Sequence, residues 1–127
     1  MENIEIIDYE GRYQPVFKEL NAEWLYQYNL MEERDIETLD DPKRMILGAG
    51  GVIYLARCGE QIVGSAALIP EHHGVYELAK MVVAKEFRNR GISRLLIERC
   101  LEMAKTLGAT KVSLFSNSQL KAAIILY

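Results

Sequence analysis

Residues 82–93 read Val82-Val83-Ala84-Lys85-Glu86-Phe87-Arg88-Asn89-Arg90-Gly91-Ile92-Ser93, a strand-like run that enters an amphipathic helix through a basic turn with a glycine. The first N–H groups of a helix lack partners within the helix, and the helix dipole adds partial positive charge there. Such a turn can bind an anion through its main chain. A Cβ atom at Gly91 would keep phosphate oxygens away from the backbone. The segment therefore predicts a phosphate-binding turn, with a solvated basic turn as the alternative.

Composition limits the function classes that need to be considered. The chain of 127 residues has the length of one domain, and half of its residues are apolar. Its formal net charge of -3 argues against nucleic acid as the main partner, because phosphate backbones bind basic surfaces. No apolar run approaches the roughly 20 residues that cross a bilayer. The N-terminus lacks a secretory signal pattern, and Cys58 and Cys100 form no metal-ligand spacing. We therefore expect a cytoplasmic protein without nucleic-acid, membrane or metal partners.

Hydrophobic periodicity and turn residues divide the chain into strands and helices. The pattern predicts strands at 4–8, 52–57, 62–69, 75–83 and 111–115, and helices that begin near residues 13, 42, 92 and 118. The strand at 75–83 is apolar on both faces, which favours a central place. The helical crossover before strand 111–115 predicts that these two strands are parallel. The helix at 92–107 is expected to bury Ile92, Leu95, Leu96, Cys100, Met103 and Leu107, and the last helix to align Leu120, Ile124 and Tyr127.

The pattern Arg88-x-x-Gly91-x-Ser93 resembles the Gln/Arg-x-x-Gly-x-Gly/Ala signature of the GNAT superfamily of N-acetyltransferases, where the turn grips the pyrophosphate of acetyl-CoA. Ser93 departs from the signature but is small enough to keep the backbone accessible. Residues 120–127 are similar to the family's Asn-x-x-Ala-x-x-Leu-Tyr helix, with Leu120 in place of asparagine. The element order β-α-α-β-β-β-α-β-α also resembles that fold. The resemblance implies one α/β (α+β) domain over residues 1–127, with a mixed, mostly antiparallel sheet and helices on both faces.

Members of the superfamily usually continue through a Gly-Phe pair into two further strands, which this sequence lacks. We therefore expect a domain that is truncated at its C-terminus, either by shortening or by natural loss of the last hairpin. In both cases strand 111–115 would lack a neighbour, and an unpaired strand edge favours pairing with another chain. A homodimer that covers this edge is the resulting hypothesis.

The resemblance also implies roles for individual residues. Met81, Val82 and Val83 are expected to bind the pantetheine arm and the thioester oxygen through their backbones, on a strand that diverges from its neighbour. The diphosphate is expected to lie on the main chain of Arg88, Asn89, Arg90, Gly91, Ile92 and Ser93. Lys85, Arg88, Arg90 and Arg94 would add positive charge. Asn117 is a candidate ligand of the pantetheine arm, and a helix-capping role is the alternative.

Two residues are candidates for proton transfer. Glu77 lies where several GNAT branches carry a general base, which would accept a proton from an ammonium substrate directly or through water. The alternative for Glu77 is a surface carboxylate paired with Lys80 or Arg57. Tyr127 falls on the family tyrosine that is often assigned as the acid for the departing thiolate; its alternative is a half-buried aromatic anchor.

The favoured function is an N-acetyltransferase that moves the acetyl group of acetyl-CoA directly to a primary amine of a small molecule or peptide in a ternary complex. A non-catalytic acetyl-CoA-binding or regulatory module is one alternative, and a general α/β interaction domain is another. Six carboxylates within residues 32–41 occupy the region of the acceptor wall in GNAT proteins. They would attract a cationic amine, although a solvated helix surface is the commoner meaning of such a charge run.

Overall fold

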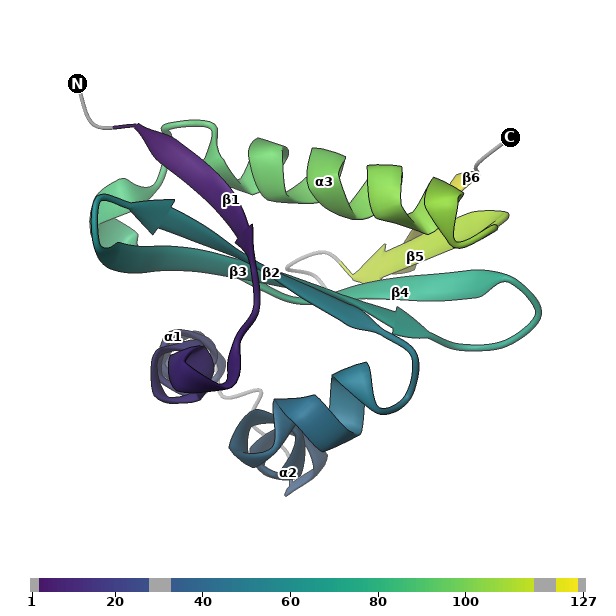
Figure 1. Cartoon of the computed structure of the whole chain (residues 1–127), viewed down its shortest axis with the longest axis horizontal. Helices are drawn as coiled ribbons and strands as arrows, with labels where there is room; N and C mark the ends of the chain where they lie inside the picture. The colour runs from purple at the N-terminus through teal and green to yellow at the C-terminus, as the bar shows by residue number, and fades with distance from the viewer. Residues whose placement is uncertain (1–2, 28–32, 116–120, 126–127) are drawn as a thin grey trace.

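The computed structural model describes residues 3–27, 33–115 and 121–125. These ranges form a six-stranded sheet whose strands lie in chain order (Figure 1). The strands are β1 (Ile4–Asp8), β2 (Val52–Cys58), β3 (Gln61–Pro70), β4 (Val75–Val83), β5 (Lys111–Phe115) and β6 (Lys121–Ile125). The helices are α1 (Gln14–Gln27), α2 (Glu33–Asp40) and α3 (Ile92–Thr106), with short turns η1 (Gly11–Tyr13), η2 (Lys43–Leu47) and η3 (Lys85–Phe87). Among the strands of these described ranges, β4 and β5 alone pair in parallel, which confirms the predicted crossover and the mostly antiparallel sheet.

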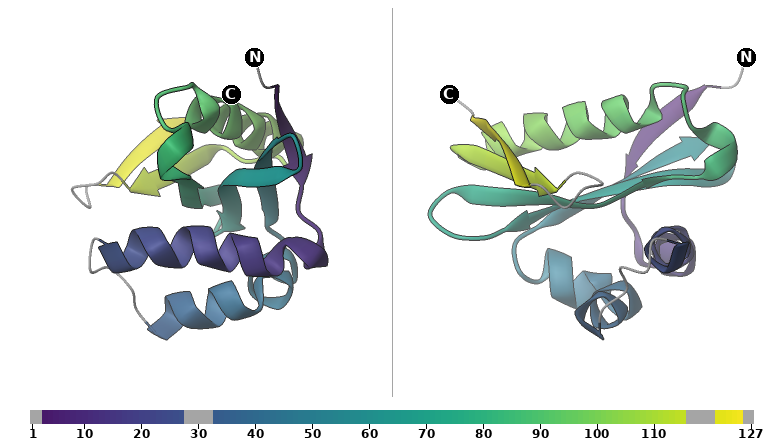
Figure 2. Two further views of the ribbon diagram at one scale, coloured as in Figure 1. Left: turned by 90° about the vertical axis from the view of Figure 1, so that its left-hand side faces the viewer. Right: turned by 180° about the vertical axis from the view of Figure 1, so that it is seen from behind.

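Helices cover both faces of the sheet, as expected. In Figures 1 and 2, α3 lies on one face, and α1 and α2 lie on the other. The core under α3 contains Leu68 and Leu96, and the core on the opposite face contains Phe17, Leu39 and Ile46, all with 0% exposure. Burial of each such side chain contributes roughly 1.5–3 kcal/mol. The two layers hold β3 and β4 in the middle of the molecule, where the candidate site begins.

The buried face of α3 is narrower than the sequence predicts. Leu95 and Leu107 are 40% and 42% exposed, so their predicted burial is wrong. The fully buried positions follow each other at every fourth residue: Ile92, Leu96, Cys100 and Ala104. Successive helical residues are rotated by roughly 100° about the axis, so that Leu95 and Leu96 cannot both face the sheet directly.

The end of the described chain is a strand, and the predicted helix there is wrong. Residues 121–125 form β6, which pairs antiparallel with β5 from Lys111↔Ile125 to Phe115↔Lys121. Pairing gives the outer edge of β5 its hydrogen-bond partners, and the β-branched Ile124 and Ile125 suit a strand. Ser118, Leu120 and Tyr127 lie outside the described residues. The open edge predicted for β5 is therefore also wrong, and the homodimer hypothesis loses the reason given for it.

Candidate functional site

A cavity of about 340 Å³ opens where β4 ends and α3 begins. Its lining residues come from the end of β4, from η3 and the turn after it, and from the first turn of α3: Met81, Val82, Val83, Phe87, Arg88, Asn89, Gly91, Ile92 and Ser93. A second cavity of about 80 Å³ reaches the same end of β4 from the side of α1. The predicted phosphate turn and the strand before it thus border one hollow.

Backbone conformation explains the glycine in this turn. Gly91 is the N-cap of α3 and has a φ of +80°, in the left-handed region that favours glycine. A Cβ atom built there would meet no atom within 4 Å, so packing does not select the glycine. Asn89 is also left-handed, with a φ of +64°. No side chain of the described residues caps the helix at Gly91, and the N–H groups of its first turn can therefore serve a ligand.

The basic side chains of the turn hold distinct positions. The Arg88 Nε donates to the Val83 carbonyl at 3.1 Å, which ties the turn to the end of β4. The Arg90 guanidinium lies 5.0 Å from the centre of the Phe87 ring and does not line the cavity. Arg94 forms an exposed ion pair with Glu98 at 3.0 Å along α3. Arg88 therefore brings positive charge to the cavity wall, and Arg90 lies against Phe87, whose ring also lines the cavity.

Phe87 was not among the predicted site residues. Its signal in the sequence is an aromatic residue within a run of charged ones, which indicates a side chain directed inward. It packs against the core under α3 and also lines the cavity. Its ring thus forms an apolar wall and carries the cation–π contact of Arg90.

The strand β4 leaves its neighbour β5 next to the cavity. The two strands pair from Val75↔Lys111 to Leu78↔Leu114, and the register ends there among the described residues. On its other edge β4 stays paired with β3 as far as Val83, opposite Gly64. The stretch from Met81 to Val83 thus borders the cavity on one edge and the sheet on the other. Backbone groups on the cavity edge are placed to bind an extended ligand arm.

Glu77 lies on β4 within the part that still pairs with β5. Its register partners are Ile69 on β3 and Ser113 on β5, and its side chain is half-buried. The Ser113 Oγ donates to the carboxylate of Glu71 in the adjoining turn. Lys80 and Arg57, the alternative partners predicted for Glu77, form ion pairs with Asp35 and Glu5. Asn117 and Tyr127 lie outside the described residues.

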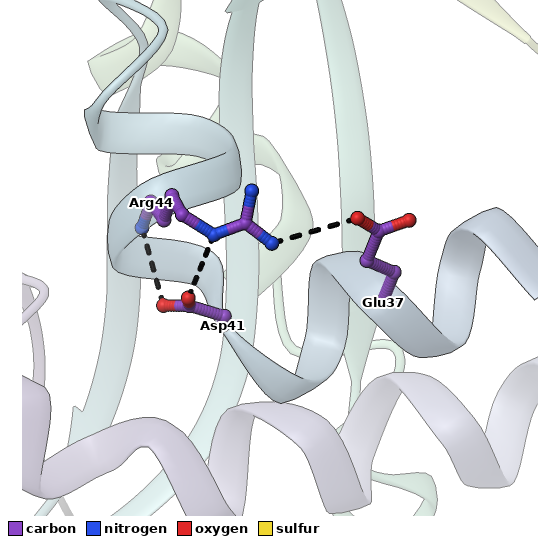
Figure 3. A network of polar contacts seen from close by, with 3 residues as sticks. All are labelled: Glu37, Asp41 and Arg44. Atoms are coloured by element: carbon purple, nitrogen blue, oxygen red, sulfur yellow. Dashed lines mark hydrogen bonds and ion pairs between the residues drawn. The ribbon is translucent and has the colours of Figure 1, made fainter.

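Ion pairs involve much of the acidic segment predicted as an acceptor wall. Arg44 of η2 binds Asp41 through its backbone N–H and its Nε, and reaches Glu37 on α2 at 3.5 Å (Figure 3). These carboxylates raise the pKa of the Arg44 guanidinium, the hydrogen bond with Asp41 being the largest cause. Asp40 pairs with Lys18 of α1, and Asp35 pairs with Lys80 of β4. The segment thus joins α2 to its surroundings, and this weakens the argument for attraction of a cationic acceptor.

Other candidate features of the sequence stay apart from the cavity. His72 and His73 are exposed in the turn between β3 and β4. Within residues 3–27, 33–115 and 121–125, no three His, Cys, Asp or Glu side chains are grouped to hold a metal ion. The helices of these same ranges are all too short or too polar to cross a membrane.

Comparison with known proteins agrees with this geometry. Residues 13–127 match the family model described as "Acetyltransferase (GNAT) family". N-acetyltransferase family 8 member 2 of Rattus norvegicus is 30% identical over 94 residues, which are 70% of this chain and 42% of that protein. The chain thus spans less than half the length of this curated relative.

Solved structures share the fold. An acetyltransferase of the GNAT family from Staphylococcus aureus Mu50 has a TM-score of 0.83 and 25% sequence identity to this chain. The match covers 92% of this chain and 75% of the Staphylococcus aureus chain. A GNAT family acetyltransferase from Elizabethkingia anophelis, solved with acetyl-CoA bound, has a TM-score of 0.62 and 24% identity. The match covers 88% of this chain and 64% of that one.

Proposed function

Because the chain belongs to the acetyltransferase (GNAT) family, we propose that it binds acetyl-CoA at the start of α3 and transfers the acetyl group to a primary amine. The observation that carries this proposal is the cavity where the uncapped N-terminus of α3 meets the diverging end of β4. A diphosphate requires N–H donors and positive charge, and an extended thioester arm requires a free strand edge. The N–H groups at the start of α3 and the free edge at the end of β4 lie side by side at the cavity.

The residues of the cavity fit the parts of the coenzyme. The main chain of the turn from Arg88 to Ser93 would hold the diphosphate, with the guanidinium groups of Arg88 and Arg90 nearby. The backbone from Met81 to Val83 would hold the pantetheine arm, and Asn117 is proposed to assist it. Acetyl-CoA supplies an activated acetyl thioester when bound. The apolar side of Phe87 would exclude water from this arm.

We assign the proton transfers to two side chains. Glu77 would accept the proton that the amine nitrogen loses as its bond to the acetyl carbon forms. Tyr127 would give a proton to the sulfur as the carbon–sulfur bond breaks. Direct transfer in a ternary complex needs no covalent enzyme intermediate. The burial of Cys100 agrees with direct transfer. Burial raises the pKa of the Cys100 thiol to about 12 and so keeps this thiol from acting as a nucleophile.

Substitution of Gly91 tests the coenzyme site, and Gly108 provides a matched control. The two glycines have φ values of +80° and +81°, and a Cβ at either would meet no atom within 4 Å. Alanine should therefore cost roughly 1–2 kcal/mol of stability at both positions. We expect Gly91→Ala to weaken acetyl-CoA binding at least about tenfold in calorimetry and Gly108→Ala to leave it unchanged, because only Gly91 borders the cavity. Equal affinities of the two variants would refute the proposed site.

Release of free thiol from acetyl-CoA in the presence of an amine panel tests the transfer itself. The panel contains polyamines, aminoglycosides and lysine peptides, which are cationic primary amines of different size. Thiol release that depends on one of these amines supports the enzyme. Acetyl-CoA binding without release for any of them favours a coenzyme-binding module instead.

Glu77→Gln tests the general base. The glutamine keeps the size of the side chain but cannot take up a proton, so we expect turnover at neutral pH to fall about 100-fold or more while coenzyme affinity is retained. Glu71→Gln is the control, since it removes a neighbouring carboxylate that binds Ser113. Unchanged turnover in Glu77→Gln, or an equal loss in both variants, would contradict the assignment.

A further inference from the structure

The strand β4 contains a bulge at a lysine with left-handed backbone. Ser65 pairs with Val82 and Ala67 pairs with Ala79, so Lys80 and Met81 together oppose the single residue between them on β3. Lys80 has a φ of +50°, a conformation that a lysine rarely adopts without support from its surroundings.

The bulge decides which side chains of β4 face α3. Successive residues of a regular strand alternate between the two faces of a sheet. Leu78 packs in the core under α3, but so do Met81 and Val83, which are out of phase with it. Without the extra residue, Met81 and Val83 would face α1 and α2. The bulge therefore sets the face on which the last residues of β4 border the cavity.

A buried chain of hydrogen bonds supports this conformation. The Ser65 Oγ donates to the Lys80 carbonyl at 2.7 Å and accepts from the Asn21 Nδ2 at 3.1 Å. The same Asn21 amide donates to the Phe17 carbonyl at 2.9 Å, which fixes its orientation in α1. Ser65 and Asn21 are 0% and 4% exposed, so water does not substitute for these partners. The carbonyl that the bulge removes from the regular ladder is thus satisfied by a side chain.

The lysine side chain adds a second connection. Its Nζ binds Asp35 of α2, and both side chains are largely buried, at 15% and 20% exposure. Residues from α1, β3 and α2 thus converge on Lys80.

We propose that Ser65, oriented by Asn21, is a positioning residue that holds Lys80 in the left-handed conformation and so aligns the end of β4 with the coenzyme. This inference rests on the proposed function. Ser65 is not among the residues that line the cavity, and its hydroxyl contacts β4 at the Lys80 carbonyl.

A double-mutant cycle separates positioning from general stability. Ser65→Ala removes the hydroxyl, and Lys80→Gly provides a residue that adopts positive φ without strain. We expect Ser65→Ala alone to raise the dissociation constant of acetyl-CoA about tenfold and to have little effect when combined with Lys80→Gly. The lost hydrogen bonds should lower stability in both backgrounds, so urea unfolding serves as the control. An equal loss of affinity in both backgrounds, or none in either, would overturn the inference. Lys80→Gly also removes the ion pair of Lys80 with Asp35. The affinity of Asp35→Asn for acetyl-CoA measures the effect of losing that ion pair alone.

Hydrogen exchange of the coenzyme-free protein gives a readout that does not depend on the proposed function. Ser65→Ala should speed exchange at the amides of Met81 and Val82 beyond the change in global stability, and Lys80→Gly should remove this effect. Unaltered exchange at these amides would overturn the positioning role. If the unmodified protein binds no acetyl-CoA, the proposed function fails, and the exchange result still decides the positioning role.

Discussion

Gly91 and Lys80 both have positive φ, but for different physical reasons. At Gly91 the conformation needs no support, because glycine adopts it freely, and the sequence therefore signals it. At Lys80 a residue with a Cβ atom is held there by the Ser65 hydroxyl and by the bulge. No local sequence pattern predicts a lysine with positive φ. The glycine turn could be predicted and the bulge beside it could not.

Cys100 shows how burial controls the chemistry of a single residue. Desolvation raises the pKa of its thiol from 9.0 to about 12. The folded protein then holds the proton more tightly than the unfolded chain, so this part of the stability is present below about pH 9 and is lost as the pH rises toward about 12. We expect the urea midpoint to fall less steeply over this range in Cys100→Ala than in the unmodified protein. Parallel pH profiles would contradict the burial effect.

Alkylation gives a second measure of the same burial. Near neutral pH, Cys100 in the folded protein should resist iodoacetamide and should react once urea unfolds the chain. Peptide mapping by mass spectrometry distinguishes it from Cys58, which is also buried. Rapid labelling of Cys100 in the folded state would contradict its place in the core.

At the scale of the element, the different exposure of two adjacent leucines of α3 shows which side of the helix packs on the sheet. Leu96 is 0% exposed and Leu95 is 40% exposed. Leu96→Ala should lower the free energy of unfolding by about 2–5 kcal/mol, because it leaves a cavity under the helix. Leu95→Ala should cost less than about 1 kcal/mol. Urea denaturation of both variants checks the difference, and similar losses would contradict the orientation of α3 in which Leu96 faces the sheet and Leu95 faces solvent.

The strand β6 shows where periodicity alone misleads. Leu120, Ile124 and Tyr127 have the spacing of a helix face, and that spacing predicts a helix. A short apolar run such as residues 121–125 fits a strand equally well, and periodicity cannot decide between them. The outer edge of β5 offers the hydrogen bonds that favour the strand. That edge is available for pairing only after β5 has joined β4 in the folded sheet.

At the scale of the whole molecule, the layers bring the parts of the candidate site together. The parallel β4–β5 pair and the crossover helix α3 place the start of α3 beside the end of β4. On the opposite face, Asn21 of α1 binds Ser65 of β3, which in turn binds β4 at Lys80, and Asp35 of α2 binds the Lys80 side chain directly. The proposed coenzyme cavity and the network of Asn21, Ser65 and Asp35 therefore lie on either side of one strand.

The sequence by itself determined the β2–β3 hairpin, the central strand β4, the crossover helix and the glycine turn at Gly91, because each depends on residues close together in the chain. Only the tertiary structure decided the bulge at Lys80, the strand β6 and the ion pairs of α2. At the bulge and in the ion pair of Asp35 with Lys80, partners far apart in sequence supply the hydrogen bonds and charges. The strand β6 forms because β5, once it lies in the sheet, offers an edge with which to pair. Local propensity does not contain that information, since the energy of such contacts exists only after the sheet and its helices have assembled.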